Sequence, residues 1–506
     1  MSTASITSGR VVPESLLELI DPDRETPALV SPEDGAEISH AALRESVLDL
    51  GERLRSAGAD PGGRVAVVLP NGPEIVQVLL AIAGIGAAAA PLNPAYTEPE
   101  YRFYLDDLAP QLLVAGAGAA GAARAAAPGL PVVEVTAPAN GSGLHAELHG
   151  RQLTRTAGAD GGAEDIALLL HTSGTTSRPK QVPLLQRNLT SQARSIARHY
   201  LLGPGDVSYC AMPLFHVHGL VASTLAQLAA GGAVVTPRRF SPRRFWGQAR
   251  THAISWLSAG PTLHGMILEH PGTPPASLRF ARSCSSALPP QLMREAEARY
   301  GVPMIEAYGM TEAGHQMTSN PLPPGARREG SVGVPAGAEV RVVDPAGVDV
   351  PAGEPGEVAI RGAGLTPGYL NNPEANAAAF FDDWFRTGDE GVLDDGYLRL
   401  RGRLKEMILR GGENISPHEI ESVLVAHPHV AEAVAFGVDD EKYGQTVAAA
   451  VVLTGAASPE ELRRYARESL AAFKVPDRIH VLDEIPKTPT GKVQRSRMPA
   501  HLDGGS

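Results

Sequence analysis

Residues 172–180 have the sequence Thr172-Ser173-Gly174-Thr175-Thr176-Ser177-Arg178-Pro179-Lys180, and the apolar run Ile166–Leu170 stands just before them. A continuous apolar run of this length predicts a buried strand. A loop with hydroxyl side chains, a glycine and a terminal lysine is typical of a phosphate site, where N–H groups and hydroxyls surround the oxygens and the lysine supplies charge. It is not a Walker loop, because it lacks a second glycine before Lys180 and a Ser or Thr after it. On these residues alone, a polar surface turn is the alternative.

Short β-branched runs alternate with amphipathic helical patterns on both sides of this loop. Expected strands are 65–69, 166–170, 233–235, 278–282 and 304–307, and expected helices are 73–85, 186–200, 241–250 and 289–300. Such alternation predicts an α/β fold in which helices cover mainly parallel sheets.

The chain from about residue 403 onward has a different pattern. A hairpin is predicted at 397–409, and strands are predicted at 434–438 and 447–453. Ser416 and Ser458 each precede a proline and have a glutamate three residues later, which predicts helices that begin with a capping box. We therefore expect two domains, residues 1–402 and a small α+β unit formed by residues 403–506.

Length and composition exclude several function classes. The 506 residues are 43% apolar and 20% charged, which predicts a globular chain of roughly two to four structural units. A net charge of −12 argues against nonspecific nucleic-acid binding and against a basic membrane-surface protein. No apolar run reaches the ~20 residues of a membrane helix. From the charge and the short apolar runs we expect no nucleic-acid or membrane partner. Because Cys210 and Cys284 are the two cysteines, we expect a reducing, cytoplasmic location.

Six further motifs follow one another along the chain. They are Pro213-Leu214-Phe215-His216, Tyr308-Gly309-Met310-Thr311-Glu312, Gly368-Tyr369, Arg386-Thr387-Gly388-Asp389, Gly402-Arg403-Leu404-Lys405-Glu406 and Pro489-Thr490-Gly491-Lys492. Together with the hydroxyl-rich loop, these motifs resemble the set that marks the adenylate-forming superfamily, which contains acyl-CoA synthetases, adenylation domains of peptide synthetases and luciferases. The resemblance spans nearly the whole chain, and several motifs in order are far more specific than one.

The resemblance implies a fold and a reaction. The implied fold is a large N-terminal domain of parallel-rich sheets covered by helices, with a β-barrel-like part, followed by a small mobile α+β C-terminal domain. In the implied reaction a carboxylate attacks the α-phosphate of ATP, which gives an acyl-adenylate and pyrophosphate, and a thiol then displaces AMP. ATP, Mg²⁺ and coenzyme A are therefore expected. Because two anions must approach each other, catalysis is expected to come mostly from positioning and electrostatics.

The resemblance also assigns a nucleotide site. Glu312 matches the family's Mg²⁺ ligand, and hard carboxylate oxygens suit that ion. Thr311 is expected to donate to the α-phosphate and Tyr308 to lie against adenine. Asp389 is expected at the ribose, and Arg403 at the same ribose or at the phosphate. The expected ATP and AMP contacts are Thr172, Ser173, Gly174, Thr175, Thr176, Lys180, Ser285, Ser286, Ala287, Glu306, Tyr308, Gly309, Thr311, Asp389 and Arg403.

Other matches concern catalysis and the thiol. Lys492 matches the lysine that the family's C-terminal domain brings to the reacting carboxylate and phosphate, and Lys405 matches the hinge. Gly411 and Gly412 match the lining of the pantetheine tunnel for coenzyme A, where the absence of a Cβ permits close approach. His216 matches an aromatic gate between the carboxylate and thiol routes. The expected catalytic residues are Lys492, His216, Thr311 and Glu312.

The expected acid pocket is polar, whereas a fatty acid needs an apolar tunnel. His216, Ser283, Ser285 and His315 are the expected acid contacts, because the second carboxylate of a buried diacid needs hydrogen-bond donors. The sequence at 175–180, 214–220, 282–285, 319–323 and 472–476 resembles the oxalate–CoA ligases in particular. Oxalate is therefore the expected acid, with oxalyl-CoA, AMP and diphosphate as products.

Two positions depart from the family pattern. Gln181 stands where glycine usually follows the loop lysine, and Gly314 stands where the oxalate subgroup has a larger residue, which could widen the pocket. The alternatives are a CoA ligase for another small or aryl acid, an adenylation enzyme that loads a carrier protein, and a non-catalytic nucleotide-binding protein. The presence of Lys180, Glu312, Asp389 and Lys492 argues against the last of these.

Overall fold

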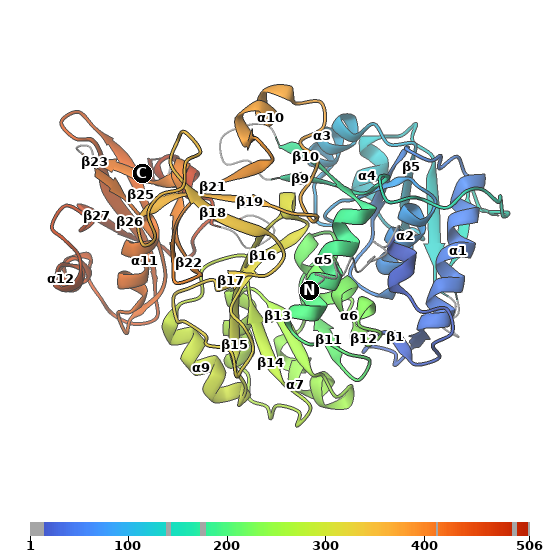
Figure 1. Cartoon of the computed structure of the whole chain (residues 1–506), viewed down its shortest axis with the longest axis horizontal. Helices are drawn as coiled ribbons and strands as arrows, with labels where there is room; N and C mark the ends of the chain where they lie inside the picture. Colours follow the sequence, from blue (N-terminus) through green and yellow to red (C-terminus); the bar gives the residue numbers. More distant parts are fainter. Residues whose placement is uncertain (1–14, 138–142, 173–178, 411–412, 488–492, 504–506) are drawn as a thin grey trace, which may run out of the picture.

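The structure is a computed structural model of the chain and describes residues 15–137, 143–172, 179–410, 413–487 and 493–503. The described residues form four sheets with helices packed around them (Figure 1). Two large mixed sheets make up the N-terminal part, an antiparallel sheet lies beside them, and a smaller sheet forms the C-terminal lobe. The predicted α/β architecture with a barrel-like part and a small α+β unit is confirmed.

The sheet beside the hydroxyl-rich loop consists of β3 (Arg64–Val68), β4 (Ala88–Pro91), β5 (Leu112–Gly116), β6 (Val132–Thr136), β7 (His145–Leu148), β8 (Arg151–Gln152), β9 (Ile166–Thr172) and β10 (Lys180–Leu185). Its order is β10-β9-β4-β3-β5-β6-β7-β8, and the inner strands from β9 to β6 run parallel. Every residue of helix α2 (Pro73–Gly84) except Glu74 is buried, and the helix packs on β4 and β9. An apolar sequence with a proline at its first position thus becomes a helix buried within the core.

The sheet that positions the candidate site consists of β1 (Pro27–Val30), β2 (Glu37–Ser39), β11 (Val207–Cys210), β12 (Ala233–Val235), β13 (Trp256–Ala259), β14 (Phe280–Ser283), β15 (Met304–Met310), β16 (His315–Ser319) and β17 (Val334–Pro335). Its order is β17-β16-β15-β14-β13-β11-β12-β1-β2. The strands from β1 to β15 in this order run parallel, so their carboxyl ends share one edge. At that edge β15 turns back through the short helix η3 (Thr311–Ala313) into β16.

The third sheet is the barrel-like part and is antiparallel. It consists of β18 (Glu339–Val343), β19 (Pro355–Arg361), β20 (Phe380–Phe381), β21 (Trp384–Asp394) and β22 (Tyr397–Arg403). The prediction of a hairpin at 397–409 is wrong, because β22 pairs with the preceding strand β21 and the chain then turns through η4 (Leu404–Glu406). The charged residues at 403–406 therefore mark the passage between two sheets and not a hairpin turn.

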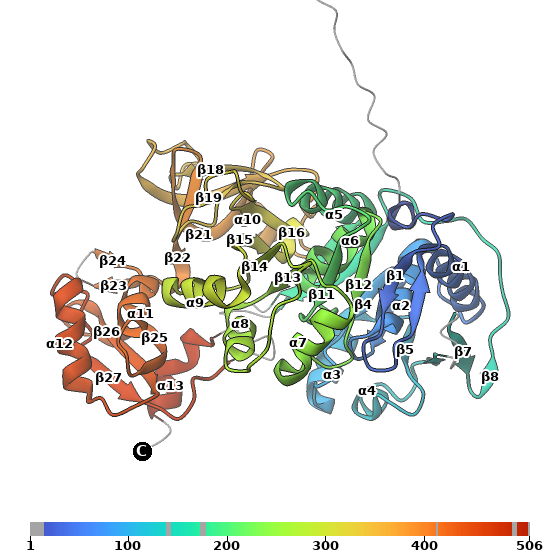
Figure 2. The same cartoon turned by 90° about the horizontal axis from the view of Figure 1, so that it is seen from below.

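The C-terminal lobe has a core of its own. Its elements are β23 (Ile408–Arg410), β24 (Glu413–Ile415), α11 (Pro417–Val425), β25 (Val430–Asp440), β26 (Gly444–Leu453), α12 (Pro459–Ser469), β27 (Arg478–Val481), η5 (Arg495–Arg497) and α13 (Met498–Asp503). Buried side chains such as Ile415, Leu424, Val447 and Leu462 pack together in it. Figures 1 and 2 both show this lobe at one end of the molecule. The expected boundary between residues 402 and 403 stays a prediction.

The two predicted capping boxes have different outcomes. Ser458 accepts a hydrogen bond from the N–H of Glu461, and the Glu461 side chain accepts from the N–H of Ser458, so the box before α12 is confirmed. Ser416 does precede α11, but its hydroxyl donates to the carbonyl of Arg401 on β22. Glu419 instead accepts from Lys474 at 2.7 Å. The prediction of a capping box at Ser416 is therefore wrong, because the Ser416 and Glu419 side chains bind residues far away in the sequence.

The remaining helices agree with the predicted pattern where one was predicted. They are η1 (Leu16–Leu19), α1 (His40–Ser56), α3 (Glu98–Leu108), α4 (Gly121–Ala126), α5 (Gln186–His199), η2 (His218–Leu225), α6 (Ala226–Ala229), α7 (Pro242–Thr251), α8 (Pro261–Leu268), α9 (Pro290–Tyr300) and α10 (Pro373–Ala379). Among the described residues, no helix is both long enough and apolar enough to span a bilayer.

Candidate active site

Strands β9 and β10 form the two sides of the predicted phosphate loop. Thr172 at the end of β9 lies opposite Lys180 at the start of β10. Gln181 donates from its amide to the carbonyl and the carboxylate of Asp107 on α3, each at 2.7 Å. Because successive strand residues point to opposite faces, this amide lies on the face away from the Lys180 side chain. The predicted loop contacts Ser173, Gly174, Thr175 and Thr176 lie outside the described residues.

Lys180, Tyr369 and Glu312 come together from three different parts of the chain. The Lys180 ammonium lies 4.4 Å from the centroid of the Tyr369 ring, which is a cation–π distance. The Tyr369 hydroxyl donates to Oε1 of Glu312 at 2.9 Å. A tyrosine ring thus stands between the lysine expected at the phosphates and the carboxylate expected at the metal. The sequence motif Gly368-Tyr369 was recognised, but the role of Tyr369 in connecting these two groups was not predicted.

Glu312 is a suitable ligand for a nucleotide-bound Mg²⁺. It lies in η3 and is 6% exposed, and its carbonyl accepts from the N–H of Thr366 at 2.7 Å. Within the described residues, no group of three or more His, Cys, Asp or Glu side chains could hold a metal ion by itself. One carboxylate fits an ion that takes its other ligands from phosphate oxygens and water, as Mg²⁺ commonly does beside nucleotides. Thr311, the expected α-phosphate donor, is the preceding residue of η3.

Tyr308, Asp389 and Arg403 form a second cluster. The Tyr308 hydroxyl on β15 donates to Oδ2 of Asp389 on β21, and Nε of Arg403 lies 2.8 Å from Oδ1 of the same carboxylate. Burial, followed by the charge of Asp389, raises the pKa of Tyr308 above its usual value, so its hydroxyl stays protonated. Tyr308 and Arg403 therefore hold the carboxylate expected at the ribose in place.

The expected adenine segment lies above a buried carboxyl group. Ser285, Ser286 and Ala287 are exposed, whereas Glu306 on β15 is 8% exposed. The N–H of Leu288 donates to Oε1 of Glu306 at 3.3 Å, which ties the segment to the sheet. Burial raises the pKa of Glu306 to about 7. The carboxyl is therefore partly protonated at neutral pH.

Two glycines set the position of His315. A Cβ on Gly309 would lie 2.0 Å from the carbonyl oxygen of His315, so only glycine fits there. Gly314 has φ +64°, and a Cβ on it would lie 3.1 Å from Cγ of Gln192 and from the carbonyl of Gly364. A larger residue at 314 would thus meet Gln192 and Gly364, so the hypothesis that Gly314 widens the acid pocket is not supported by the geometry. His315 itself has φ +145° and is 2% exposed.

His218 lies directly beside His315 at the expected acid site. Their ring centroids are 4.9 Å apart, and Nδ1 of His218 lies 2.8 Å from the Ser285 hydroxyl. His218 begins η2, a buried π-helix, and such segments are often found at functional sites. A Cβ on the next residue, Gly219, would lie 2.3 Å from the carbonyl of Pro213, so glycine permits the tight entry into this helix.

Arg282 and Ser258 are pocket residues to which the sequence reasoning gave no role. Arg282 on β14 is completely buried, and its guanidinium contacts the Ser258 hydroxyl at 2.8 Å and Nε2 of His315 at 3.5 Å. Ser258 on β13 also lies 2.7 Å from Nε2 of His218. The sequence signal for Arg282 was an arginine inside a predicted buried strand, where an unpaired charge is very rare. Nothing in the sequence distinguished Ser258 from other strand serines.

The two expected serine contacts lie in different surroundings. Ser285 reaches His218, whereas Ser283 directly follows Arg282 on β14 and so points to the other face of the sheet. Ser283 is fully buried, and its hydroxyl has no hydrogen-bond partner among the described residues. His216, the expected gate, lies in the loop before η2 with its ring centroid 4.7 Å from that of Phe215. The structure thus joins Ser285 and His315 to one network and leaves Ser283 outside it.

The predicted residues of the C-terminal lobe are only partly described. Lys405 lies in η4 with an exposed side chain, between the last strand of the barrel-like sheet and the first strand of the lobe. Gly411, Gly412 and Lys492 lie outside the described residues.

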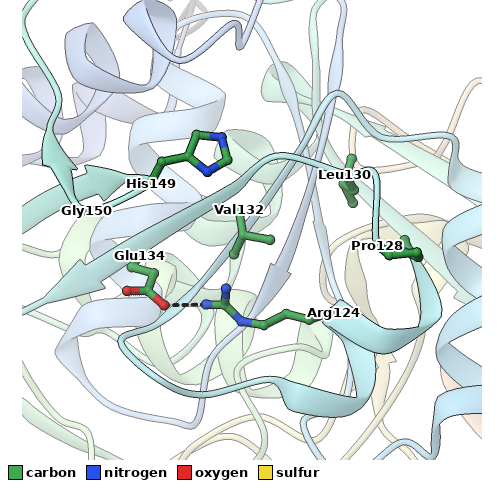
Figure 3. A pocket seen from close by; sticks show the side chains of 8 residues that line it. Arg124, Pro128, Leu130, Val132, Glu134, His149 and Gly150 are labelled. Atoms are coloured by element: carbon green, nitrogen blue, oxygen red, sulfur yellow. Dashed lines mark hydrogen bonds and ion pairs between the residues drawn. The ribbon is translucent and has the colours of Figure 1, made fainter.

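Two surface cavities lie away from these clusters. Figure 3 shows one of about 330 Å³, in which Arg124 donates to Glu134 at 2.5 Å beside His149. The other, about 480 Å³, is lined by residues near Arg24 and Arg44. None of the predicted site residues lines either cavity.

Comparison with known proteins agrees with this arrangement. The model of the AMP-binding enzyme family matches residues 20–370, and the model of the AMP-binding enzyme C-terminal domain matches residues 419–492. An oxalate–CoA ligase of Arabidopsis thaliana is 44% identical, with 92% of this chain and 93% of the relative covered. A sulfoacetate–CoA ligase of Cupriavidus necator is 40% identical, with 95% of both covered. The crystal structure of ATP-bound MatB from Rhodopseudomonas palustris superposes with a TM-score of 0.87 at 30% identity, over 96% of this chain and 98% of that one.

Proposed function

This chain belongs to the AMP-binding enzyme family and is an AMP-forming acid–thiol ligase that works through an acyl-adenylate, and we propose that its acid is oxalate. The reaction is oxalate + ATP + coenzyme A → oxalyl-CoA + AMP + diphosphate. In this proposal residues 1–402 bind ATP and the acid, and residues 403–506 form the lid that carries Lys492. A cytoplasmic location is part of the proposal, and the two buried cysteines, which form no disulfide, agree with it.

The observation that carries the oxalate proposal is the chemistry around His218 and His315. Both rings are buried, and the groups that contact them are the Ser258 and Ser285 hydroxyls and the Arg282 guanidinium. Burial lowers the pKa of both histidines well below the usual value, so both are neutral at pH 7 and each carries one N–H, that of His218 being shared with the serines beside it. A carboxylate that enters such a pocket meets donors and one positive charge. A long alkyl chain would offer no negative charge to the Arg282 guanidinium, whereas the second carboxylate of a diacid would.

The proposed first half-reaction uses residues from both large sheets. Lys180 and Thr311 bind the phosphates, Asp389 and Arg403 hold the ribose, and Tyr308 lies against adenine. Mg²⁺ held at Glu312 would neutralise charge on the phosphates. Lys492 then contacts the oxygens between the acid and the α-phosphate, where negative charge accumulates as the oxalate oxygen attacks phosphorus and diphosphate leaves.

The proposed second half-reaction needs a different position of the C-terminal lobe. Lys405, exposed in η4 between two sheets, is the proposed hinge. Gly411 and Gly412 line the path of the pantetheine thiol, His216 separates that path from the acid, and the thiol sulfur displaces AMP from the oxalyl carbon. The same donors could also bind a sulfonate, and the 40% identical sulfoacetate–CoA ligase makes sulfoacetate the second candidate.

The test is pyrophosphate release measured over a panel of acids, with and without coenzyme A. Oxalate is expected to give the highest kcat/KM, and oxalyl-CoA is expected only when coenzyme A is present. Sulfoacetate, malonate, benzoate and octanoate serve as the other members of the panel. Strong activity on octanoate or benzoate without oxalate turnover would reject the proposal. Thioester formation on a carrier protein's pantetheine but not on free coenzyme A would reject coenzyme A as the thiol acceptor.

A further inference from the structure

Arg282 is a fully buried cation whose described hydrogen bonds all go to uncharged groups. Its Nε donates to the Tyr200 hydroxyl at 2.8 Å, one terminal nitrogen to Gln316 Oε1 at 3.1 Å, and the other to the Ser258 hydroxyl at 2.8 Å. None of the ion pairs seen in the described part of the chain involves this guanidinium. An arginine keeps its charge in proteins, and a buried charge without a counterion is costly. The pocket therefore contains a permanent positive charge that its own side chains do not neutralise.

The contacts of Arg282 continue as a chain toward the pocket. Ser258 Oγ lies 2.7 Å from Nε2 of His218, and Nδ1 of His218 lies 2.8 Å from Oγ of Ser285. A guanidinium can only donate, so the Ser258 oxygen accepts from it, which leaves the Ser258 proton for Nε2 of His218. The neutral ring then carries its proton on Nδ1 and donates it to the Ser285 oxygen.

The charge of Arg282 favours this direction over the reverse one. Dipoles in a hydrogen-bond chain next to a cation are most stable with their negative ends toward it, and each bond polarises the next. The proton of Ser285 is therefore not used by His218, and it stays available at an exposed residue. His315 follows the same rule, because its Nε2 faces the guanidinium at 3.5 Å and must present a lone pair there.

We propose that Arg282 is the positioning residue that sets acid specificity: through Ser258 and His218 it aims the Ser285 hydroxyl proton at the substrate. Its uncompensated charge selects acids with a second anionic group over equally sized acids whose second group is neutral. This inference rests on the proposed function, because it concerns the acid that the same site binds. In this proposal Arg282 and Ser258 act from behind Ser285 and the two histidines, which are the residues closer to the acid.

The test compares oxalate with oxamate, in which a neutral amide replaces one carboxylate at nearly the same size. The measured quantity is the ratio of the oxamate inhibition constant to the oxalate KM, for the wild-type enzyme and the variants Arg282→Gln, Arg282→Lys and Ser258→Ala. Arg282→Gln is expected to lower the ratio about 10- to 100-fold, as expected when one partner of a buried charge pair is removed. Ser258→Ala is expected to lower it about threefold to tenfold, and Arg282→Lys is expected to restore part of the loss seen with Arg282→Gln. The KM for ATP is expected to stay within about twofold in all variants.

Ser255→Ala is the matched control. Ser255 is a buried serine three residues before Ser258, and within the described ranges its hydroxyl is hydrogen-bonded to the backbone of Val207 alone. This variant is expected to keep the wild-type ratio. If Arg282→Gln does not fold, the oxamate-to-oxalate ratios of Ser258→Ala and Arg282→Lys test the proposal, because both variants keep a positive charge at position 282.

Two results would overturn the inference and can be told apart. An oxalate–oxamate ratio that stays at the wild-type value in Ser258→Ala and in the soluble Arg282 variants, while both constants weaken together, would show a structural role only. Absence of oxalate turnover in the wild-type enzyme would instead overturn the proposed function, and this inference with it.

Discussion

The hydroxyl of Tyr369 donates a 2.9 Å hydrogen bond to Oε1 of Glu312. This bond orients the carboxylate proposed to hold the metal, and the Lys180 ammonium lies over the same ring. Tyr369 and Glu312 are 57 residues apart, so only the tertiary fold brings them together. The lysine proposed to bind the phosphates and the carboxylate proposed to bind the metal thus both contact one side chain.

Tyr369→Phe is expected to raise the KM for MgATP about tenfold. A hydrogen bond to a charged group is worth about 1.5–3 kcal/mol, and the released carboxylate would lose its fixed orientation. Steady-state kinetics at varied ATP and saturating acid measure the change. Tyr397→Phe is the control, because the Tyr397 hydroxyl donates to the backbone of Ala326 away from the site. An unchanged KM in Tyr369→Phe would mean that Glu312 does not need this bond.

Ser285→Ala and Ser283→Ala are expected to differ although the residues are two positions apart. Ser285→Ala removes a hydroxyl that contacts His218 and should raise the oxalate KM about tenfold, with a smaller effect on the KM for ATP. Ser283→Ala should change neither constant, and it should leave the free energy of unfolding unchanged or slightly higher, because its hydroxyl has no partner among the described residues. Equal kinetic losses in both variants would contradict the assignment of Ser285 to the pocket.

Glu306→Gln is expected to change how stability depends on pH. Burial raises the pKa of Glu306 to about 7, above its usual 4.5, so the folded state holds more protons than the unfolded state between these pH values. The free energy of unfolding of the wild-type enzyme should therefore fall as pH rises from 5 to 7, by about 2 kcal/mol from this group. Glutamine remains uncharged and should remove this slope.

Urea unfolding at pH 5, 6, 7 and 8 measures the slope of the wild-type enzyme and of Glu306→Gln. Glu295→Gln serves as the control, because Glu295 is an exposed carboxylate on α9. A Glu306→Gln variant with the same pH slope as the wild-type enzyme would show that Glu306 titrates normally in the folded state.

Gly314→Ala is expected to reduce stability and leave acid selectivity unchanged. A residue with a side chain at φ +64° costs roughly 1 kcal/mol relative to glycine, and its Cβ would lie 3.1 Å from Gln192 and Gly364. Thermal unfolding should show the loss, while the oxalate–oxamate ratio should remain at its wild-type value. A changed ratio would mean that position 314 does border the acid.

Lys492→Ala is expected to abolish adenylate formation and to spare thioester formation from a supplied oxalyl-adenylate. The lysine is proposed to contact charge that develops only in the first half-reaction, so only that step depends on it. Pyrophosphate release measures the first step, and thioester formation from the synthetic adenylate measures the second. Equal loss in both assays would indicate a structural role for Lys492.

Much of the fold follows from local pattern. The apolar run at 166–170 became β9, and the periodic segment at 186–200 became α5 (Gln186–His199), because burial periodicity is a property of neighbouring residues. The hairpin expected at 397–409 was wrong, because local pattern does not say which strands pair. The partner of β22 is β21, which precedes the segment. The hydroxyl of Ser416 likewise binds the Arg401 carbonyl on β22 instead of capping α11.

The amino-acid sequence by itself determined the reaction class, because its motifs resemble those of the AMP-binding enzyme family in both residues and order. It also determined the alternation of strands and helices, which is set by local periodicity. Only the tertiary structure decided that Arg282 meets Ser258 and His315, and that Ser285 rather than Ser283 reaches His218. These contacts depend on which strands are neighbours in the sheet and on which face each side chain occupies, and both result from packing the whole chain.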